Sequence, residues 1–150
     1  MNNHLFQAIK LFDSKRPQGN GVDFANFLLW WIVMEAYLTD ISEKSGARKA
    51  IDKFESNQKL KNLLVEAWRK MHVQTWAGWV KCLCDKQPFV FKNRKDIIAN
   101  RLDPNVIEIL NVMYCIRGNL IHGNVNPLRN DVNQIHFCCA SLLSQWLKYL

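Results

Sequence analysis

An arginine and a histidine stand five positions apart in the last quarter of the chain, as Arg117 and His122. Their neighbours are largely aliphatic, and a folding argument alone would favour more aliphatic residues at both places. Histidine can take and give a proton near neutral pH, and the forked donors of arginine match phosphate oxygens. The pair could therefore promote attack of a ribose 2′-hydroxyl on its own phosphodiester without a metal, with the arginine stabilising the charged phosphorane-like state.

A helix over residues 104–122 must position this pair. Its apolar residues recur at three- and four-residue spacing, which predicts one long buried face. Asp103 is expected as the N-cap and Pro104 in the first turn, while Gly123 suits the left-handed position that ends a helix.

The spacing of the pair bears on how a site could form. Arg117 projects from the apolar stripe, so this face must open onto a cleft or a second protein, because a guanidinium is not left bare in a core. His122 lies roughly 140° further round an ideal helix. Fraying of the last turn could bring the two side chains together, or two chains could contribute to one cleft.

The rest of the chain has the pattern of one all-α domain over residues 1–150, a bundle of four main helices with shorter ones added. The longest apolar stretch predicts a helix over residues 24–41 with Asp23 as its cap. Because this stretch is apolar almost all round, we expect it to be the central helix. Further helices are predicted over residues 4–12, 47–54, 57–71, 76–83 and 128–150, with a loop or short extended insertion at 85–93.

Glu35 is the one charge inside the apolar part of the 24–41 helix. It is either an acid near the Arg–His cleft or a structural residue paired with a basic side chain. We favour the structural role, with an arginine as partner, because a buried carboxylate needs a compensating group.

The formal net charge is +7, which points to a polyanionic partner such as RNA. Residues 81–101 are the most cationic part of the chain. A solvated surface explains this segment about as well as a nucleic-acid contact does. The candidate RNA-binding residues are Lys92, Arg94, Lys95, Arg101 and Arg129.

The five cysteines are an odd number, and no secretory leader is evident, so a reducing cytosol is expected. Cys82 with Cys84, and Cys138 with Cys139 and His136, have zinc-ligand types but not the usual spacing, so buried thiols are favoured over a metal site. We predict no metal and no cofactor. No apolar run approaches the roughly 20 residues needed to cross a bilayer, so no membrane association is predicted.

Two blocks of the sequence resemble the HEPN domains (higher eukaryotes and prokaryotes nucleotide-binding). The HEPN signature is Arg-x4-6-His near the end of the penultimate main helix, and Arg117-Gly-Asn-Leu-Ile-His122 has its x4 form. The run Ile116–Gly123 is similar to the "RNNLFHG" run of the Apea-like and related defence-associated branches. The block Leu28–Tyr37 looks like their "FLLYWIALEAL" helix.

This resemblance implies a metal-independent endoribonuclease that acts on RNA as a homodimer with a composite active site. Arg117 and His122 would be the catalytic pair. A polar residue commonly follows the arginine in this family, whereas here Gly118 does and the polar group comes next, as the candidate supporting residue Asn119. The implied setting is the cytoplasm of a prokaryotic cell, with the protein as a toxin or antiviral-defence effector that has an antitoxin or other partner protein.

Two other classes of function remain open on the sequence. A catalytically inactive HEPN-like module would use the same residues for dimerisation or for binding RNA or a protein. A structural helical subunit of a larger complex would bind no RNA at all.

Overall fold

The computed structural model describes residues 23–42, 51–52, 54–84 and 104–148. In chain order, the helices are α2 (Asp23–Ser42), α4 (Gln58–Lys70), α5 (Val73–Cys84), α6 (Val106–Ile121) and α7 (Asn130–Leu147). No strand occurs in the described ranges, which confirms the predicted all-α class for them. Within the same ranges, no helix is both long and apolar enough to cross a membrane.

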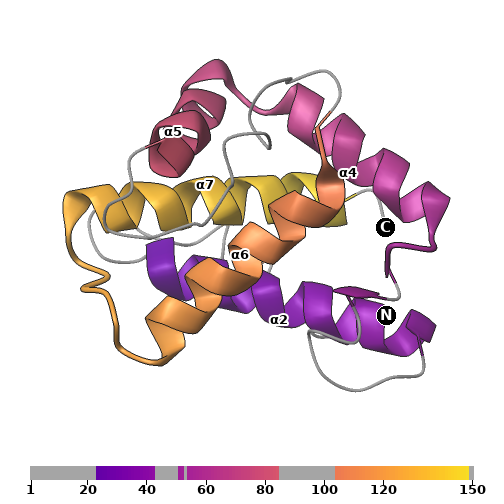
Figure 1. Ribbon diagram of the computed structural model, residues 1–150, viewed down its shortest axis with the longest axis horizontal. Coiled ribbons are helices and arrows are strands. Elements are labelled where there is room, and N and C mark those ends of the chain that lie inside the picture. Colours follow the sequence, from indigo (N-terminus) through magenta and orange to yellow (C-terminus); the bar gives the residue numbers. More distant parts are fainter. Residues whose placement is uncertain (1–22, 43–50, 53, 85–103, 149–150) are drawn as a thin grey trace.

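Helix α7 lies at the centre of the arrangement. It packs most extensively against α2 and also contacts α4 and α5, while α6 lies across the bundle at an angle to α2 and α7 (Figure 1). The prediction that the helix over residues 24–41 is central is therefore corrected. Its buried side faces α7, and on its other side Ile32 remains 49% exposed.

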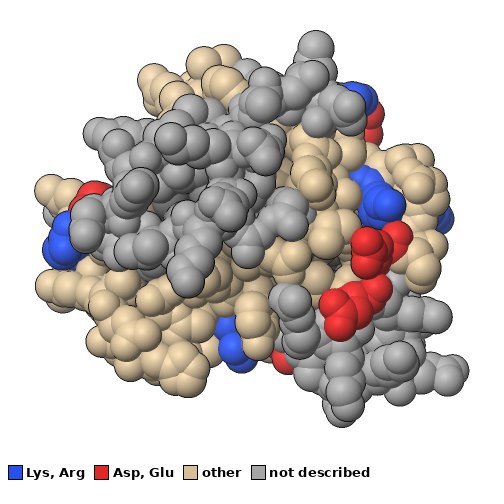
Figure 2. Space-filling view, viewed as in Figure 1, with Lys and Arg blue, Asp and Glu red and all other residues tan. Residues whose placement is uncertain are grey.

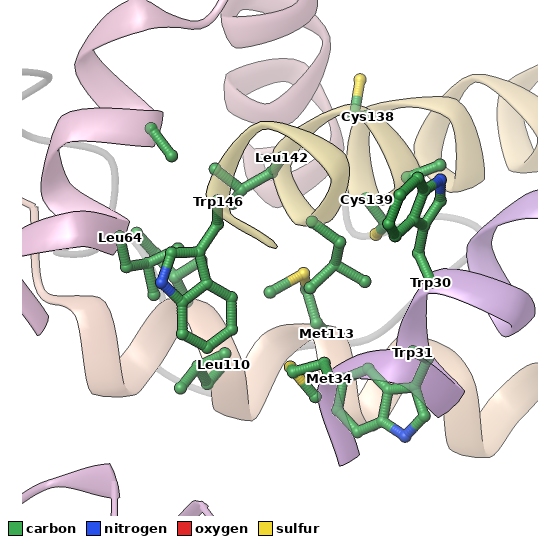
Figure 3. Close-up of a cluster of buried hydrophobic side chains, with 14 of the residues drawn as sticks. Trp30, Trp31, Met34, Leu64, Leu110, Met113, Cys138, Cys139, Leu142 and Trp146 are labelled. Carbon is green, nitrogen blue, oxygen red and sulfur yellow. The ribbon is translucent and has the colours of Figure 1, made fainter. Parts of the chain in front are cut away.

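The core is built from large apolar side chains that come from every helix. Trp31, Trp68, Trp79 and Trp146 are fully buried, which accounts for most of the tryptophans as packing groups. Figure 3 shows how α2, α4, α6 and α7 meet around this core, through Trp30, Trp31, Met34, Leu64, Leu110, Met113, Cys138, Cys139, Leu142 and Trp146.

Local signals set several helix boundaries as expected. The predicted helix over residues 24–41 matches α2 closely, with Asp23 in its first turn. Asn57 is the N-cap of α4, and its side-chain oxygen accepts a hydrogen bond of 3.1 Å from the backbone N–H of Leu60. The predicted final helix over residues 128–150 is shorter in the structure, which begins α7 at Asn130.

The start of α6 differs from the prediction. The helix begins at Val106, and the carbonyl of Asn105 accepts the first helical hydrogen bond, from the N–H of Ile109 at 3.1 Å. Pro104 therefore lies just before the helix rather than in its first turn. Asp103, the expected cap, lies outside the described residues.

Gly78 lies inside α5, which continues through it. A Cβ atom at this position would come within 2.8 Å of the Cys138 Sγ on α7. The glycine therefore permits the close approach of α5 to α7, and the cost of its backbone freedom is offset by packing.

Several predicted segments lie outside the described residues, namely the helix over residues 4–12, most of the 47–54 helix and the loop at 85–93. The single-domain organisation over residues 1–150 stays a prediction.

Candidate functional site

The end of α6 is fixed by backbone hydrogen bonds that place the residues around His122. Gly123 has a φ of +69°, the left-handed conformation predicted for it. The N–H of Gly123 donates to the carbonyl of Leu120 at 3.2 Å, and the N–H of Asn124 donates to the carbonyl of Asn119 at 2.9 Å. This bond pair is the Schellman motif, which makes His122 the C-terminal cap of the helix.

Arg117 and His122 line the same open depression, which has a volume of about 430 Å³. The sequence argument had identified only three of its residues as candidates for a role, Arg117, His122 and Asn119. The depression is a polar face of α6 and of the turn that follows it. Its remaining lining residues are Asn111, Tyr114, Cys115, Gly118 and Asn124.

Asn111, Tyr114, Cys115 and Asn124 were missed as site residues. Three- and four-residue steps back along the helix from Gly118 lead to Tyr114, Cys115 and Asn111, so helical spacing could have found them. The fold of the turn, rather than any spacing rule, adds Asn124.

The side chain of Arg117 is half-buried and held by an aromatic ring. Its Cζ atom lies 5.9 Å from the centroid of the Tyr114 ring, within the range of a cation–π contact. Its Nε is buried and has no hydrogen-bond acceptor among the described residues. An anion that enters the depression would meet a guanidinium whose charge no described carboxylate neutralises.

His122 lies exposed beside the same depression. Its backbone N–H donates to the carbonyl of Gly118 at 3.0 Å, which holds the last turn of the helix. A ring in this position is accessible to a substrate and to water, as a proton-transfer group must be.

Asn119 is the third residue predicted for the site, and it lines the depression. Its side-chain amide donates to the carbonyl of Cys115, one turn earlier, at 2.9 Å. The amide nitrogen is thus occupied within the helix, so Asn119 helps to shape the wall of the depression.

Glu35 does not take an arginine partner among the described residues. Its Oε2 accepts a hydrogen bond of 3.0 Å from the indole Nε1 of Trp31, one turn earlier on α2. The Trp31 ring lies 6.2 Å from the Tyr114 ring, centroid to centroid. Glu35 is therefore connected to the depression only through two aromatic rings, which favours the structural role over that of a catalytic acid.

Of the candidate RNA-binding residues, the structure describes Arg129, which is not among the residues that line the depression. Arg129 lies at the start of α7 and forms two hydrogen bonds to Asp131, one of them from Nε at 3.0 Å. Lys92, Arg94, Lys95 and Arg101 lie outside the described residues. On the face shown in Figure 2, the described Lys and Arg side chains are scattered, and several lie beside Asp or Glu.

Cys138, Cys139 and His136 behave as core groups, whereas Cys115 is half-buried and lines the depression. Burial raises the pKa of the Cys138 thiol to about 12, and the thiol donates to the carbonyl of Thr75 at 3.3 Å. His136 stacks on Phe27 with 5.7 Å between ring centroids, and burial lowers its pKa to about 4. No group of three or more possible metal ligands occurs in the described part of the chain. Cys82 and Cys84 have no described side chains.

Comparison with protein-family models, with curated proteins and with solved structures gives no match. The assignment of this chain to a function therefore depends on its own residues and on their geometry.

Proposed function

We propose that this protein is a metal-independent endoribonuclease of the HEPN type, with Arg117 and His122 as its catalytic pair. One observation carries the proposal: the two side chains, separated by about 140° on an ideal helix, line one open depression. The resemblance of residues 116–123 and 28–37 to HEPN domains supports the same conclusion. The bundle of helices is compatible with that fold.

In the proposed reaction, the Arg117 guanidinium binds the scissile phosphate and stabilises the charge that accumulates on its oxygens. His122 removes the proton from the ribose 2′-hydroxyl or supplies one to the leaving 5′-oxygen. A positioned general acid or base contributes about 10²–10⁴-fold in rate, and one oxyanion-stabilising donor about 10²–10³-fold. The chain's own side chains supply each of these steps, so no metal is required.

The proposal includes a homodimer with a composite active site. Both catalytic groups come from one helix end and the turn after it, and the depression is open. Two proton transfers are needed in one cleavage, whereas His122 is the one histidine that the described residues of each chain bring to the depression. A second copy would supply the other histidine and cover the substrate.

The resemblance also supports a role as a toxin or antiviral-defence effector, with a partner protein that restrains it.

Cleavage of RNA in EDTA tests the proposal. The wild type should cut RNA, and His122→Ala should be about 10²–10⁴-fold slower. His72→Ala is the matched control, because His72 is also exposed and its Nδ1 only accepts a hydrogen bond from the backbone N–H of Gln74. Equal cleavage by the wild type and His122→Ala would refute the assignment, as would loss of wild-type activity on chelation. Binding of RNA without cleavage would favour the inactive HEPN-like module.

Mixing two inactive variants tests the composite site. An Arg117→Ala chain retains His122, and a His122→Ala chain retains Arg117. If the site is shared between two copies, the mixture should recover part of the activity that each variant lacks alone. No recovery, together with a monomeric mass in sedimentation, would contradict the shared site.

A further inference from the structure

The contacts that hold the side chain of Arg117 point to a functional residue besides Arg117 and His122. A long, flexible arginine side chain binds phosphate well only if it is already aimed at the site. In many proteins a carboxylate aims an arginine, but it also neutralises the charge and competes with the phosphate. Here the guanidinium of Arg117 lies over the Tyr114 ring, whose face attracts the cation without carrying a net charge.

The Tyr114 ring is itself supported from α2. Trp31 is only 1% exposed, and its ring lies 6.2 Å from that of Tyr114 at an interplanar angle of 45°. The indole N–H of Trp31 donates to Glu35 at 3.0 Å, which fixes the orientation of the indole. A continuous series of contacts therefore runs from Glu35 through both rings to the guanidinium.

We infer that Tyr114 is a positioning residue, which holds the guanidinium of Arg117 toward the depression while leaving its charge available to a phosphate. Trp31 and Glu35 act one step further away by holding the Tyr114 ring. The inference rests on the proposed function, because it assigns a role within the same site. It also makes a claim about side-chain order that can be measured without RNA.

The test compares Tyr114→Phe, which keeps the ring, with Tyr114→Leu, which removes it. Loss of a cation–π contact corresponds to about 2- to 30-fold in rate. Tyr114→Leu should therefore lower kcat by about that factor, and Tyr114→Phe should retain nearly the wild-type value. Tyr37→Leu is the control, since Tyr37 is a partly buried tyrosine that packs against the core from α2.

A second measurement reports on Arg117 directly. The buried Nε–H of Arg117 should give a nitrogen–proton NMR signal that exchanges slowly with water and is shifted by the Tyr114 ring. The signal should persist in Tyr114→Phe, and in Tyr114→Leu it should lose the ring shift and exchange faster. Glu35→Leu should reduce the ring shift of this signal. Glu35→Gln should preserve the shift, because the amide oxygen still accepts the hydrogen bond from the indole of Trp31.

The two readouts separate the inference from the proposed function. If the NMR signal and kcat of Tyr114→Leu match those of Tyr114→Phe, the positioning role is overturned, even though wild-type cleavage would leave the function standing. If the wild type cuts no RNA but Tyr114→Leu alone loses the ring shift, the function fails and the positioning of Arg117 holds.

Discussion

Arg117 at the end of α6 and Arg129 at the start of α7 are held in opposite ways. Arg129 is exposed, and its Nε and one terminal nitrogen donate hydrogen bonds to the carboxylate of Asp131. The charge of Arg129 is therefore neutralised by an ion pair. Arg117 is half-buried against the Tyr114 ring, and its Nε has no acceptor among the described residues. The end of α6 therefore presents an unmatched cation beside a depression, whereas the start of α7 presents a neutralised one.

This difference distinguishes Arg117 from Arg129 as a group that can bind a phosphate. Both arginines are candidates for contact with RNA on sequence grounds. The ion pair at Arg129 also lowers the pKa of Asp131, chiefly through the hydrogen bond from the guanidinium, so the carboxylate keeps its charge in mild acid. A phosphate at Arg129 would have to displace Asp131, while a phosphate at Arg117 displaces no described group.

The largest expected effect separates the two arginines. Arg117→Ala should reduce RNA cleavage by about 10²–10³-fold, because it removes a donor to the charged transition state. Arg129→Ala removes the same charge from a neutralised site and should change the rate by less than about threefold. Initial rates in EDTA measure both. Similar losses in the two variants would show that overall charge, rather than the site at α6, drives the reaction.

The next effect concerns the stability of α7, where His136 is buried near the N-terminal end of α2. The unfolded chain binds a proton at His136 near pH 6.5, but the folded protein does so only near pH 4. The neutral His136 therefore leaves the free energy of unfolding at its full value above pH 6.5. This free energy falls by about 3 kcal/mol as the pH is lowered to 4.

Urea unfolding at a series of pH values measures this loss. In His136→Phe, which keeps a ring to stack on Phe27, the decline between pH 6.5 and 4 should be smaller by a similar amount. An identical pH profile in the variant would contradict the role given to His136.

Gly118 gives a smaller effect that bears on the α6 site. A Cβ atom at Gly118 would meet nothing within 4 Å, and its φ is not in the left-handed region, so the fold does not require glycine there. Gly118→Ala should stabilise the protein by about 0.5–1 kcal/mol. If RNA or a second chain approaches the bare helix backbone beside Arg117, the same variant should cleave RNA more slowly.

Gly78→Ala is the matched control for that substitution. Its Cβ would collide with the Cys138 Sγ, so it should destabilise the protein by about 1–3 kcal/mol. Thermal unfolding compares the two variants. A destabilised Gly118→Ala would show that this glycine serves the fold after all.

The smallest effect is expected at the start of α7. Asp131→Asn removes the partner of Arg129 and an acidic residue from the first turn of α7, which should cost less than about 1 kcal/mol because both side chains are exposed. Since the pKa of Asp131 is lowered in the folded protein, its contribution is present above the ordinary carboxyl pKa of 3.8 and disappears in stronger acid. Urea unfolding at pH 7 measures this cost. A decrease in the free energy of unfolding as large as the one predicted for protonation of His136 would contradict the prediction.

Local patterns in the sequence predicted much of this fold. Asn57 caps α4, Gly123 ends the α6 segment, and the apolar stretch from residue 24 forms α2, because each signal acts within one helical turn. Arg117 and His122, which line the depression, were likewise candidates from the sequence, since both are polar side chains among largely aliphatic neighbours.

The remaining features depend on contacts between distant parts of the chain. The close fit of Gly78 depends on Cys138, sixty positions later, and the central place of α7 depends on the packing of several helices. The support of Tyr114 by Trp31 crosses from α2 to α6. Helical periodicity carries no information about such partners, so the role of Tyr114 could be inferred only from the structure.

The chemistry of the cut ends tests the central claim most directly. If His122 and Arg117 promote attack of the 2′-hydroxyl on the adjacent phosphate, RNA cut in EDTA must carry 2′,3′-cyclic phosphate or 3′-phosphate ends and 5′-hydroxyl ends. Mass spectrometry of the products should show these ends for the wild type and only trace amounts for Arg117→Ala and His122→Ala. Products with 5′-phosphate ends, or the same ends formed equally fast by both variants, would contradict the account.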